Sequence, residues 1–245
     1  MKKKFVISEE KIFAMFTSGI VSENMKWCIK NNIIRLTNFA TKFGGPIHFD
    51  FRIDQACTGL AVCGVGERMA EHFLDIEKKM DIKFDSMLCS LYGGIFSGVA
   101  TAAFLKLKYN RDIKIAVSRR TYIQKSGAEA GTEEFLSSSH PLKHKMLVGE
   151  LGDNVLLHDE MTNSGDTLRD LQLISEMLGK KPKASMIIAD RILDPLPKNV
   201  HVRLLDGVPC HSIITHYEIE EWCKQHKFVW GYLYEDPDKD QNKIK

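Results

Sequence analysis

The chain has 245 residues, and its 34 lysines and arginines against 32 aspartates and glutamates give a net charge of +2 with neutral histidines. A hydrophobic content of 44% with 27% charged residues is ordinary for a soluble globular protein and excludes disordered and collagen-like classes. No apolar run approaches the roughly 18 residues of a membrane span, and no basic stripe with interleaved aromatic residues indicates nucleic-acid binding. We therefore expect a cytoplasmic protein that binds neither membranes nor nucleic acid.

The first 60 residues predict two helices and a short strand. Ser8 can cap a first helix, and a four-residue apolar repeat predicts a second one, from about Met25 to the break near residue 42, where glycines and a proline follow. Alternation at 47–53 predicts the strand.

Helices and strands alternate over the following part of the chain. The predicted elements are a helix through 69–80, a strand at 86–91, a helix at 95–106, strands at 113–117 and 154–158, a helix at 166–178 and a strand at 185–189. This order is typical of an α/β fold with a doubly wound, mainly parallel sheet flanked by helices. The segment between 118 and 152 has little periodicity and predicts a long functional loop.

The six cysteines include no CxxC pair and lie mostly inside apolar segments. This pattern favours buried, reduced thiols over a disulfide framework or a zinc site. They are Cys28, Cys57, Cys63, Cys89, Cys210 and Cys223.

The segment 154–168 carries the strongest chemical signal. A buried strand ends in the adjacent acids Asp159 and Glu160, and a loop of small residues then opens a helix. Loop amides and the positive helix end suit a phosphate monoester, and Gly165 permits close approach. The two acids face the crevice where α/β proteins bind ligands, and they could hold sugar hydroxyls or water-coordinated Mg²⁺. A capped helix after an acidic turn is the alternative, and His158 is expected to be a core histidine satisfied by local backbone.

This segment resembles the motif of type I phosphoribosyltransferases that binds 5-phosphoribosyl 1-diphosphate (PRPP). There, apolar residues precede an acidic pair and a Thr/Ser-Gly loop. The resemblance implies that Asp159 and Glu160 hold the ribose 2- and 3-hydroxyls and act in catalysis. It also implies that the 5-phosphate is bound by Thr162, Asn163, Ser164, Gly165, Asp166 and Thr167.

Three further segments in family order narrow the resemblance to orotate phosphoribosyltransferase. Residues 85–100 are similar to a strand, diphosphate loop and helix of that family, and the loop residues implied to bind PRPP are Tyr92, Gly93 and Gly94. Residues 41–52 are similar to the N-terminal segment of that family, and the residues implied to line the orotate site are Lys42, His48 and Phe49.

The third segment is the strand 187–191, which ends in Asp-Arg, together with the following strand at 207–215. The resemblance implies that Arg191 meets orotate, and a fixed guanidinium suits a planar anionic pyrimidine. Taken alone, Arg191 fits a surface salt bridge better than a ligand contact, and that salt bridge is the alternative.

The resemblance also implies a mobile loop that closes over the diphosphate, here at 119–139. Arg119 and Arg120 correspond to its paired basic residues, Arg119 binding PRPP and Arg120 acting in catalysis, and Lys125 is the nearby cation that can replace the family's later lysine. Three positions depart from the family pattern. Glu160 replaces a second aspartate, Asn163 replaces a threonine, and Gly93 stands where some members carry a diphosphate-binding lysine.

The implied reaction converts orotate and PRPP into orotidine 5-monophosphate and pyrophosphate, a pentosyl transfer in pyrimidine biosynthesis. It uses Mg²⁺ held mainly through PRPP and water, with no direct protein ligand, in a homodimer. We expect one domain over residues 1–245, with N-terminal helices and a hood at 1–60, an α/β core at 61–215, and a C-terminal helix and tail at 216–245. The alternatives are a PRPP-binding regulator that has lost catalysis, and a phosphoribosyltransferase for another nucleobase.

Overall fold

The computed structural model describes residues 34–36, 49–51, 59–91, 93–118, 147–162, 164–192, 196–197, 200–215, 217–218, 228–229 and 232–233. The chain divides into two compact units. The larger unit is Ile53–His216, and the smaller one combines Met1–Arg52 with Tyr217–Lys245.

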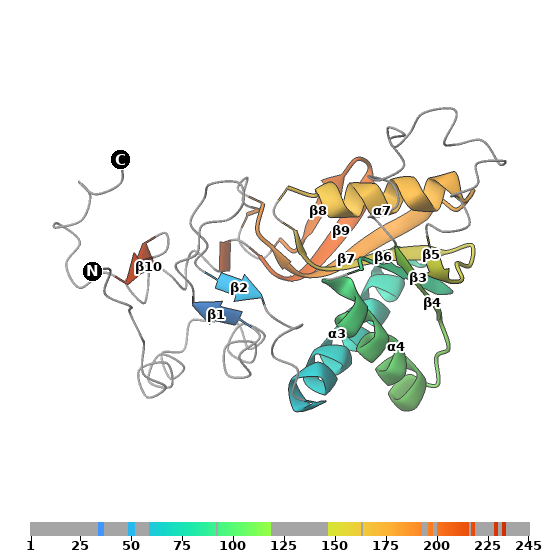
Figure 1. The fold of residues 1–245 in the computed structure, drawn as a ribbon, viewed down its shortest axis with the longest axis horizontal. Helices are drawn as coiled ribbons and strands as arrows, with labels where there is room; N and C mark the ends of the chain where they lie inside the picture. Colours follow the sequence, from blue (N-terminus) through green and yellow to red (C-terminus); the bar gives the residue numbers. More distant parts are fainter. Residues whose placement is uncertain are drawn as a thin grey trace. The chain divides into compact units, whose positions relative to one another are not determined.

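The larger unit is built on a seven-stranded sheet with the order β5-β4-β3-β6-β7-β9-β8 (Figure 1). Its strands are β3 (Ser86–Cys89), β4 (Lys114–Ser118), β5 (Leu147–Gly149), β6 (Val155–Thr162), β7 (Pro182–Asp190), β8 (Val202–Leu205) and β9 (Val208–Ile214). The five inner strands are parallel, and β5 and β8 are antiparallel to their neighbours at the two edges. The carboxyl ends of β3, β6 and β7 therefore lie next to one another.

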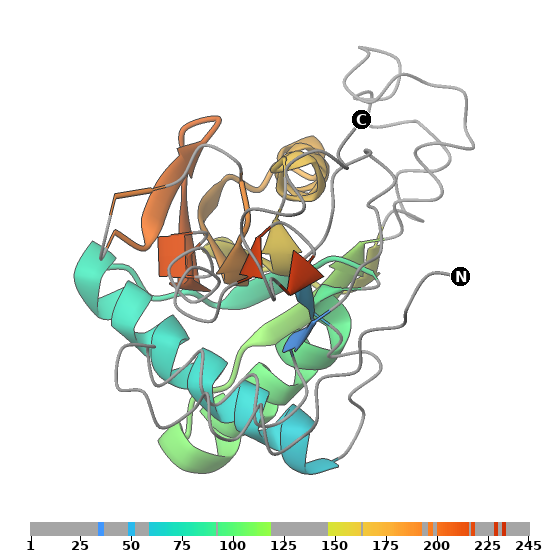
Figure 2. The same cartoon turned by 90° about the vertical axis from the view of Figure 1, so that its left-hand side faces the viewer.

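Helices cover both faces of this sheet. Helices α3 (Gly59–Met80) and α4 (Gly94–Tyr109) lie on one face, and α7 (Asp166–Met177) lies on the other, as Figures 1 and 2 show from two sides. The helix predicted through 69–80 is confirmed as the second half of α3, and its apolar residues Met69, Phe73 and Ile76 are fully buried. The predicted α/β fold with a doubly wound, mainly parallel sheet is confirmed.

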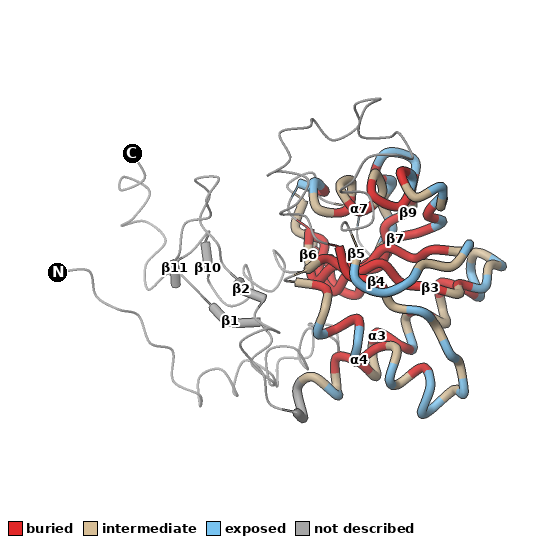
Figure 3. The backbone as a smooth tube through the Cα atoms, turned by 45° about the vertical axis from the view of Figure 1, so that its right-hand side comes forward, coloured by how far each residue is buried: buried red, intermediate tan, exposed pale blue. Residues whose placement is uncertain are grey.

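The central strands are buried along nearly their whole length, because both of their faces pack against helices (Figure 3). One cluster of buried side chains fills the space between the sheet and α7. It includes Leu88, Leu157, Leu171, Ile174 and Ile187. This packing fixes the strands whose ends carry the predicted site.

Several predicted boundaries differ from the structure. The strand expected to end at 158 continues to Thr162, so the two acids lie inside β6 and not after it. The cause is pairing with β7, which extends to the Thr162–Asp190 pair. The segment expected to be one long loop contains β5, which pairs with β4, and β8 is a strand that the pattern did not predict. Both are edge strands of only three and four residues, which is too short for a clear alternation of polar and apolar residues.

The smaller unit contains two short antiparallel pairs. Strand β1 (Ile34–Leu36) pairs with β2 (Phe49–Phe51), and β10 (Phe228–Val229) pairs with β11 (Tyr232–Leu233). The second predicted helix is wrong at 34–36, since the β-branched Ile34 favours a strand once a partner strand is present. The hairpin of β10 and β11 falls in the segment expected to hold a C-terminal helix and tail.

Three of the six cysteines fall within the described residues. Cys89 and Cys210 are buried free thiols, as expected, and Cys63 is exposed, contrary to the expectation of burial. Cys63 lies near the start of α3, on the side away from the core. Cys28, Cys57 and Cys223 lie outside the described residues. None of the described helices combines the length and apolar content that crossing a membrane requires.

Candidate functional site

The acidic pair lies near the carboxyl end of β6, and both side chains are only 6% exposed. The carboxylate of Asp159 is oriented by two donors to the same oxygen. The hydroxyl of Ser90 donates to Asp159 Oδ1 at 2.6 Å, and the backbone N–H of Glu160 donates to it at 2.8 Å. A carboxylate held in this way keeps one orientation, which a ligand of fixed geometry requires.

Ser90 connects the acidic pair to the turn between β3 and α4. It follows the last residue of β3, and its hydroxyl oxygen also accepts a hydrogen bond from the backbone N–H of Gly94 at 2.8 Å. One hydroxyl therefore joins the predicted diphosphate loop to the predicted ribose-binding acids. Sequence reasoning did not select Ser90. The only available signal was a small polar residue at the carboxyl end of a buried strand.

The two glycines of this turn approach β6 too closely for any side chain. A Cβ atom on Gly93 would lie 2.6 Å from Asp159 Oδ1, and one on Gly94 would lie 2.6 Å from the carbonyl oxygen of His158. Residues that are more than 60 positions apart in the sequence thus meet at one point.

His158 serves the core and not the site. Its ring is fully buried, with Nε2 2.7 Å from Ser97 Oγ and Nδ1 3.0 Å from the carbonyl oxygen of Met186. Burial lowers the pKa of His158 to about 4, so the ring is neutral near pH 7. The prediction of a satisfied core histidine is confirmed, with the carbonyl supplied by the neighbouring strand β7.

The predicted phosphate loop connects β6 to α7, as expected. Gly165 caps the helix in the left-handed region at φ +87°, where glycine is favoured, and as a glycine it supplies no side-chain cap. The backbone N–H of Asp166, the first residue of α7, makes a long hydrogen bond of 3.5 Å to Ser164 Oγ. Amides at a helix start are suited to an anion. Thr162 is buried at the end of β6, Ser164 and Asp166 are exposed, and Thr167 lies in the first turn of α7.

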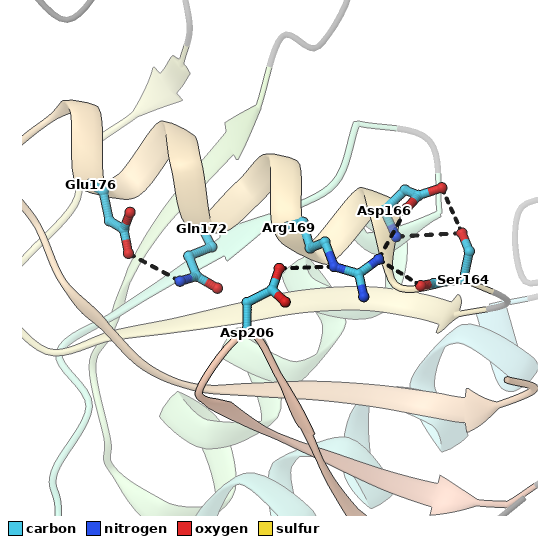
Figure 4. Close-up of polar contacts among 6 residues, drawn as sticks. All are labelled: Ser164, Asp166, Arg169, Gln172, Glu176 and Asp206. Atoms are coloured by element: carbon cyan, nitrogen blue, oxygen red, sulfur yellow. Dashed lines mark hydrogen bonds and ion pairs between the residues drawn. The ribbon is translucent and has the colours of Figure 1, made fainter. Parts of the chain in front are cut away.

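An arginine of α7 braces this loop (Figure 4). Arg169 Nη1 donates to the carbonyl oxygen of Ser164 at 2.8 Å and to Asp166 Oδ1 at 3.0 Å, while its Nε donates to Asp206 Oδ2 at 2.9 Å. Asp206 lies in the turn between β8 and β9. The guanidinium offsets the negative charge of Asp166, which would otherwise oppose an anion at the helix start.

Arg191 is placed beside the end of β6. Its backbone N–H donates to the carbonyl oxygen of Thr162 at 2.8 Å, and its guanidinium contacts the sulfur of Met161, with Nη1 3.4 Å from Sδ. The predicted base-binding arginine therefore neighbours the strand that carries the acids.

The structure thus brings together Gly93, Gly94, Asp159, Glu160 and Arg191 with the loop at 162–167. Phe49 lies in β2 of the smaller unit. The remaining predicted residues lie outside the described ones: Lys42, His48, Tyr92, Arg119, Arg120, Lys125 and Asn163. Within the described ranges, no three His, Cys, Asp or Glu side chains gather as metal ligands.

Comparisons with known proteins bear on the fold and on the class of protein. No family model matches the chain. The orotate phosphoribosyltransferase of Janthinobacterium sp. (strain Marseille) is 26% identical over 175 residues, which are 71% of this chain and 70% of that protein. The protein of the same name from Herminiimonas arsenicoxydans is 25% identical over 175 residues, with the same coverage of both chains.

A solved structure supports the fold. The crystal structure of orotate phosphoribosyltransferase from Francisella tularensis has a TM-score of 0.56 and 19% identity, and the likeness covers 83% of this chain and 91% of that one. The fold is that of the type I phosphoribosyltransferases, and together with the sequence likeness it indicates an enzyme that transfers a pentosyl group. Within that class, the proteins that this chain resembles are orotate phosphoribosyltransferases, which confirms the resemblance inferred from the motifs.

Proposed function

We propose that this protein is an orotate phosphoribosyltransferase, which converts orotate and PRPP into orotidine 5-monophosphate and pyrophosphate. One observation carries the proposal. The Gly93–Gly94 turn, the acidic pair and the start of α7 converge where β3 and β6 end, in a chain that resembles proteins of that name. The carboxyl ends of parallel strands are where α/β proteins bind their ligands.

The acidic pair holds the ribose in this proposal. Asp159 and Glu160 accept hydrogen bonds from the 2- and 3-hydroxyls of PRPP, and Ser90 keeps Asp159 in place for them. Breaking the bond to the diphosphate leaves positive charge on the ribose ring. Two carboxylates buried beside that ring favour this charge, because the low local polarity strengthens their attraction to it.

The phosphate groups of PRPP meet backbone amides. The diphosphate lies against the Gly93–Gly94 turn, where the absence of side chains permits close approach, and the 5-phosphate lies at the start of α7. Arg119, Arg120 and Lys125 close over the diphosphate and exclude water from the reacting carbon.

The donor chemistry of the site fits Mg²⁺. This ion prefers carboxylate, phosphate and water oxygens, and it usually takes one or two carboxylates while keeping several waters. Asp159 and Glu160 would hold it through its water molecules, with the phosphates of PRPP as its main ligands. When bound, Mg²⁺ neutralises charge that develops on the leaving diphosphate.

Orotate recognition rests with Arg191, which pairs its planar guanidinium with the anionic pyrimidine. On the family resemblance alone, we also assign Lys42, His48 and Phe49 a role in binding orotate. We further propose that the chain acts as one phosphoribosyltransferase domain over residues 1–245, forms a homodimer, and works in the cytoplasm in pyrimidine nucleotide synthesis.

The test is the loss of orotate absorbance with PRPP and Mg²⁺, beside a reaction without Mg²⁺ and a panel of uracil, adenine, guanine and hypoxanthine. Turnover of orotate that needs Mg²⁺ supports the proposal. Saturable PRPP binding without turnover of any base contradicts it and favours a PRPP-binding regulator, and turnover of another base alone favours a different substrate.

Two variants tie the activity to the site. Asp159→Asn removes one of the ribose-binding charges and should lower kcat/KM by about a hundredfold or more. Asp153→Asn is the matched control, because Asp153 is exposed and pairs with Lys180 before the start of β6, at the opposite end of that strand. Equal losses in both variants would contradict the assignment of the acidic pair.

A further inference from the structure

A buried ion pair lies directly beside the proposed base site, and no part of the family resemblance assigns it. Arg203 Nε donates to Asp190 Oδ2 at 2.5 Å. The two side chains are 11% and 2% exposed, respectively. Asp190 is the last residue of β7, and Arg203 lies on the edge strand β8, with β9 between the two strands. Charged groups are costly to bury unless they are paired, so the pair invites a functional explanation.

The second oxygen of Asp190 shapes the chain around Arg191. Asp190 Oδ1 accepts a hydrogen bond from the backbone N–H of Ile192 at 3.0 Å, which turns the backbone tightly through Arg191. On the other side, the backbone N–H of Arg191 donates to the carbonyl oxygen of Thr162 at 2.8 Å. The amides at 191 and 192 are therefore both held by hydrogen bonds, and the second depends on the orientation of the Asp190 carboxylate.

We propose that Arg203 is a positioning residue for the base: it holds the Asp190 carboxylate, which in turn fixes the backbone from which Arg191 reaches orotate. The proposal rests on the proposed function. Arg203 touches no substrate in this role. It acts because recognition of a planar ring by a guanidinium tolerates only about 0.5 Å and 10–20° of misplacement.

Without Arg203, Asp190 would be a buried carboxylate that has lost its cation. It would turn toward water, and this movement weakens its hold on the Ile192 amide. The loop that carries Arg191 would then sample several positions. The phosphate loop would keep its own brace, since Arg169 contacts Ser164 and Asp166 independently of Asp190. The loss of Arg203 should therefore weaken the binding of orotate and leave the binding of PRPP nearly unchanged.

The test is a comparison of the two Michaelis constants in the full-length protein. Arg203→Met keeps most of the side-chain volume and removes the cation. We expect its KM for orotate to rise about tenfold and its KM for PRPP to change less than about twofold. Arg203→Lys, which keeps the charge without the planar fork, should restore part of the orotate affinity.

Arg111→Met is the matched control. Arg111 Nη2 pairs with Glu77 Oε1 at 2.6 Å, with side chains 28% and 9% exposed, so its loss also removes a partly buried ion pair. It lies just before β4, at the amino ends of the strands and away from the site. This variant should lose stability without a change in either Michaelis constant.

A second variant guards against unfolding. Asp190→Asn combined with Arg203→Met leaves no unpaired buried charge, so it should unfold at a higher temperature than Arg203→Met alone. Because the amide side chain is no longer held by Arg203, its orotate KM should still be raised.

The outcomes separate the two proposals. If the wild type converts orotate and Arg203→Met leaves the orotate KM unchanged, or raises both Michaelis constants equally, the role of Arg203 is overturned and the proposed function stands. If the wild type binds PRPP but neither binds nor converts orotate, the proposed function fails, and the positioning role fails with it.

Discussion

Ser90 offers the sharpest test of the site, because its single hydroxyl joins the two halves of the proposed PRPP site. It donates to Asp159 Oδ1 at 2.6 Å and accepts from the Gly94 amide at 2.8 Å, in a buried position. Ser90→Ala removes both hydrogen bonds and leaves the Gly94 N–H without this acceptor. A buried group that loses its partner costs about 1–3 kcal/mol, and hydrogen bonds to charged groups contribute about 1.5–3 kcal/mol.

The expected loss of unfolding free energy is about 2.5–3 kcal/mol, at the low end of that sum, since Asp159 Oδ1 keeps the Glu160 N–H as a donor. For a chain of this size, the loss lowers Tm by roughly 5–12 °C. The freed Asp159 carboxylate should also misalign the ribose and lower kcat/KM for PRPP by about 10- to 100-fold.

Thermal unfolding and the orotate absorbance assay at varied PRPP measure the two effects. Ser175→Ala is the control, because Ser175 is a buried serine near the end of α7 whose hydroxyl donates to the carbonyl oxygen of Lys180 at 2.8 Å. It should lose stability while keeping kcat/KM. A Ser90→Ala enzyme that is destabilised but retains the wild-type kcat/KM would refute the link between Ser90, Asp159 and the ribose.

Three other changes should follow from the same geometry. Gly93→Ala keeps an allowed backbone conformation (φ −80°, ψ −45°) but forces its Cβ against Asp159, so PRPP turnover should fall about a hundredfold; an active alanine variant would show that the turn can move away. Burial lowers the pKa of His158 and of His72 to about 4, so the unfolded chain binds more protons than the folded one between about pH 4 and 6.5. In urea unfolding, the free energy of unfolding should therefore have its full value above about pH 6.5 and fall by about 3 kcal/mol per histidine toward pH 4. A flat pH profile would mean that both rings take up protons freely in the folded protein. Arg169→Met removes the side chain that braces the phosphate loop. Because the ion pairs of Arg169 are half-exposed, the KM for PRPP should rise only about three- to tenfold, with little change in Tm. An unchanged KM for PRPP would place the 5-phosphate elsewhere.

Local patterns in the sequence were sufficient for the α/β core. The apolar spacing of α3 and the run of buried residues in β6 and β7 depend on which side chains leave water, and that property can be read along the chain. The acidic pair and the glycine-containing loop before α7 could also be recognised in the sequence. Their motif is contiguous, so the residues that act together follow one another along the chain.

Boundaries set by pairing were predicted less well. β6 continues through Asp159 and Glu160 because β7 pairs with it as far as Asp190, a contact between segments 28 residues apart. Residues 34–36 became a strand because β2 was available to pair with them. In both cases the hydrogen bonds of a neighbouring strand outweighed the preference of the local sequence.

The contacts that hold the site came only from the tertiary structure. Ser90 lies 69 residues from Asp159, and Arg203 lies 13 residues and two strands away from its partner Asp190. Serine and arginine are common residues, and no pattern around either one identifies a partner. The sequence by itself determined which residues are charged and where glycines allow a phosphate to come close to the backbone. Which of them share a hydrogen bond was decided by the order of strands in the sheet, because that order alone brings their side chains within 3 Å.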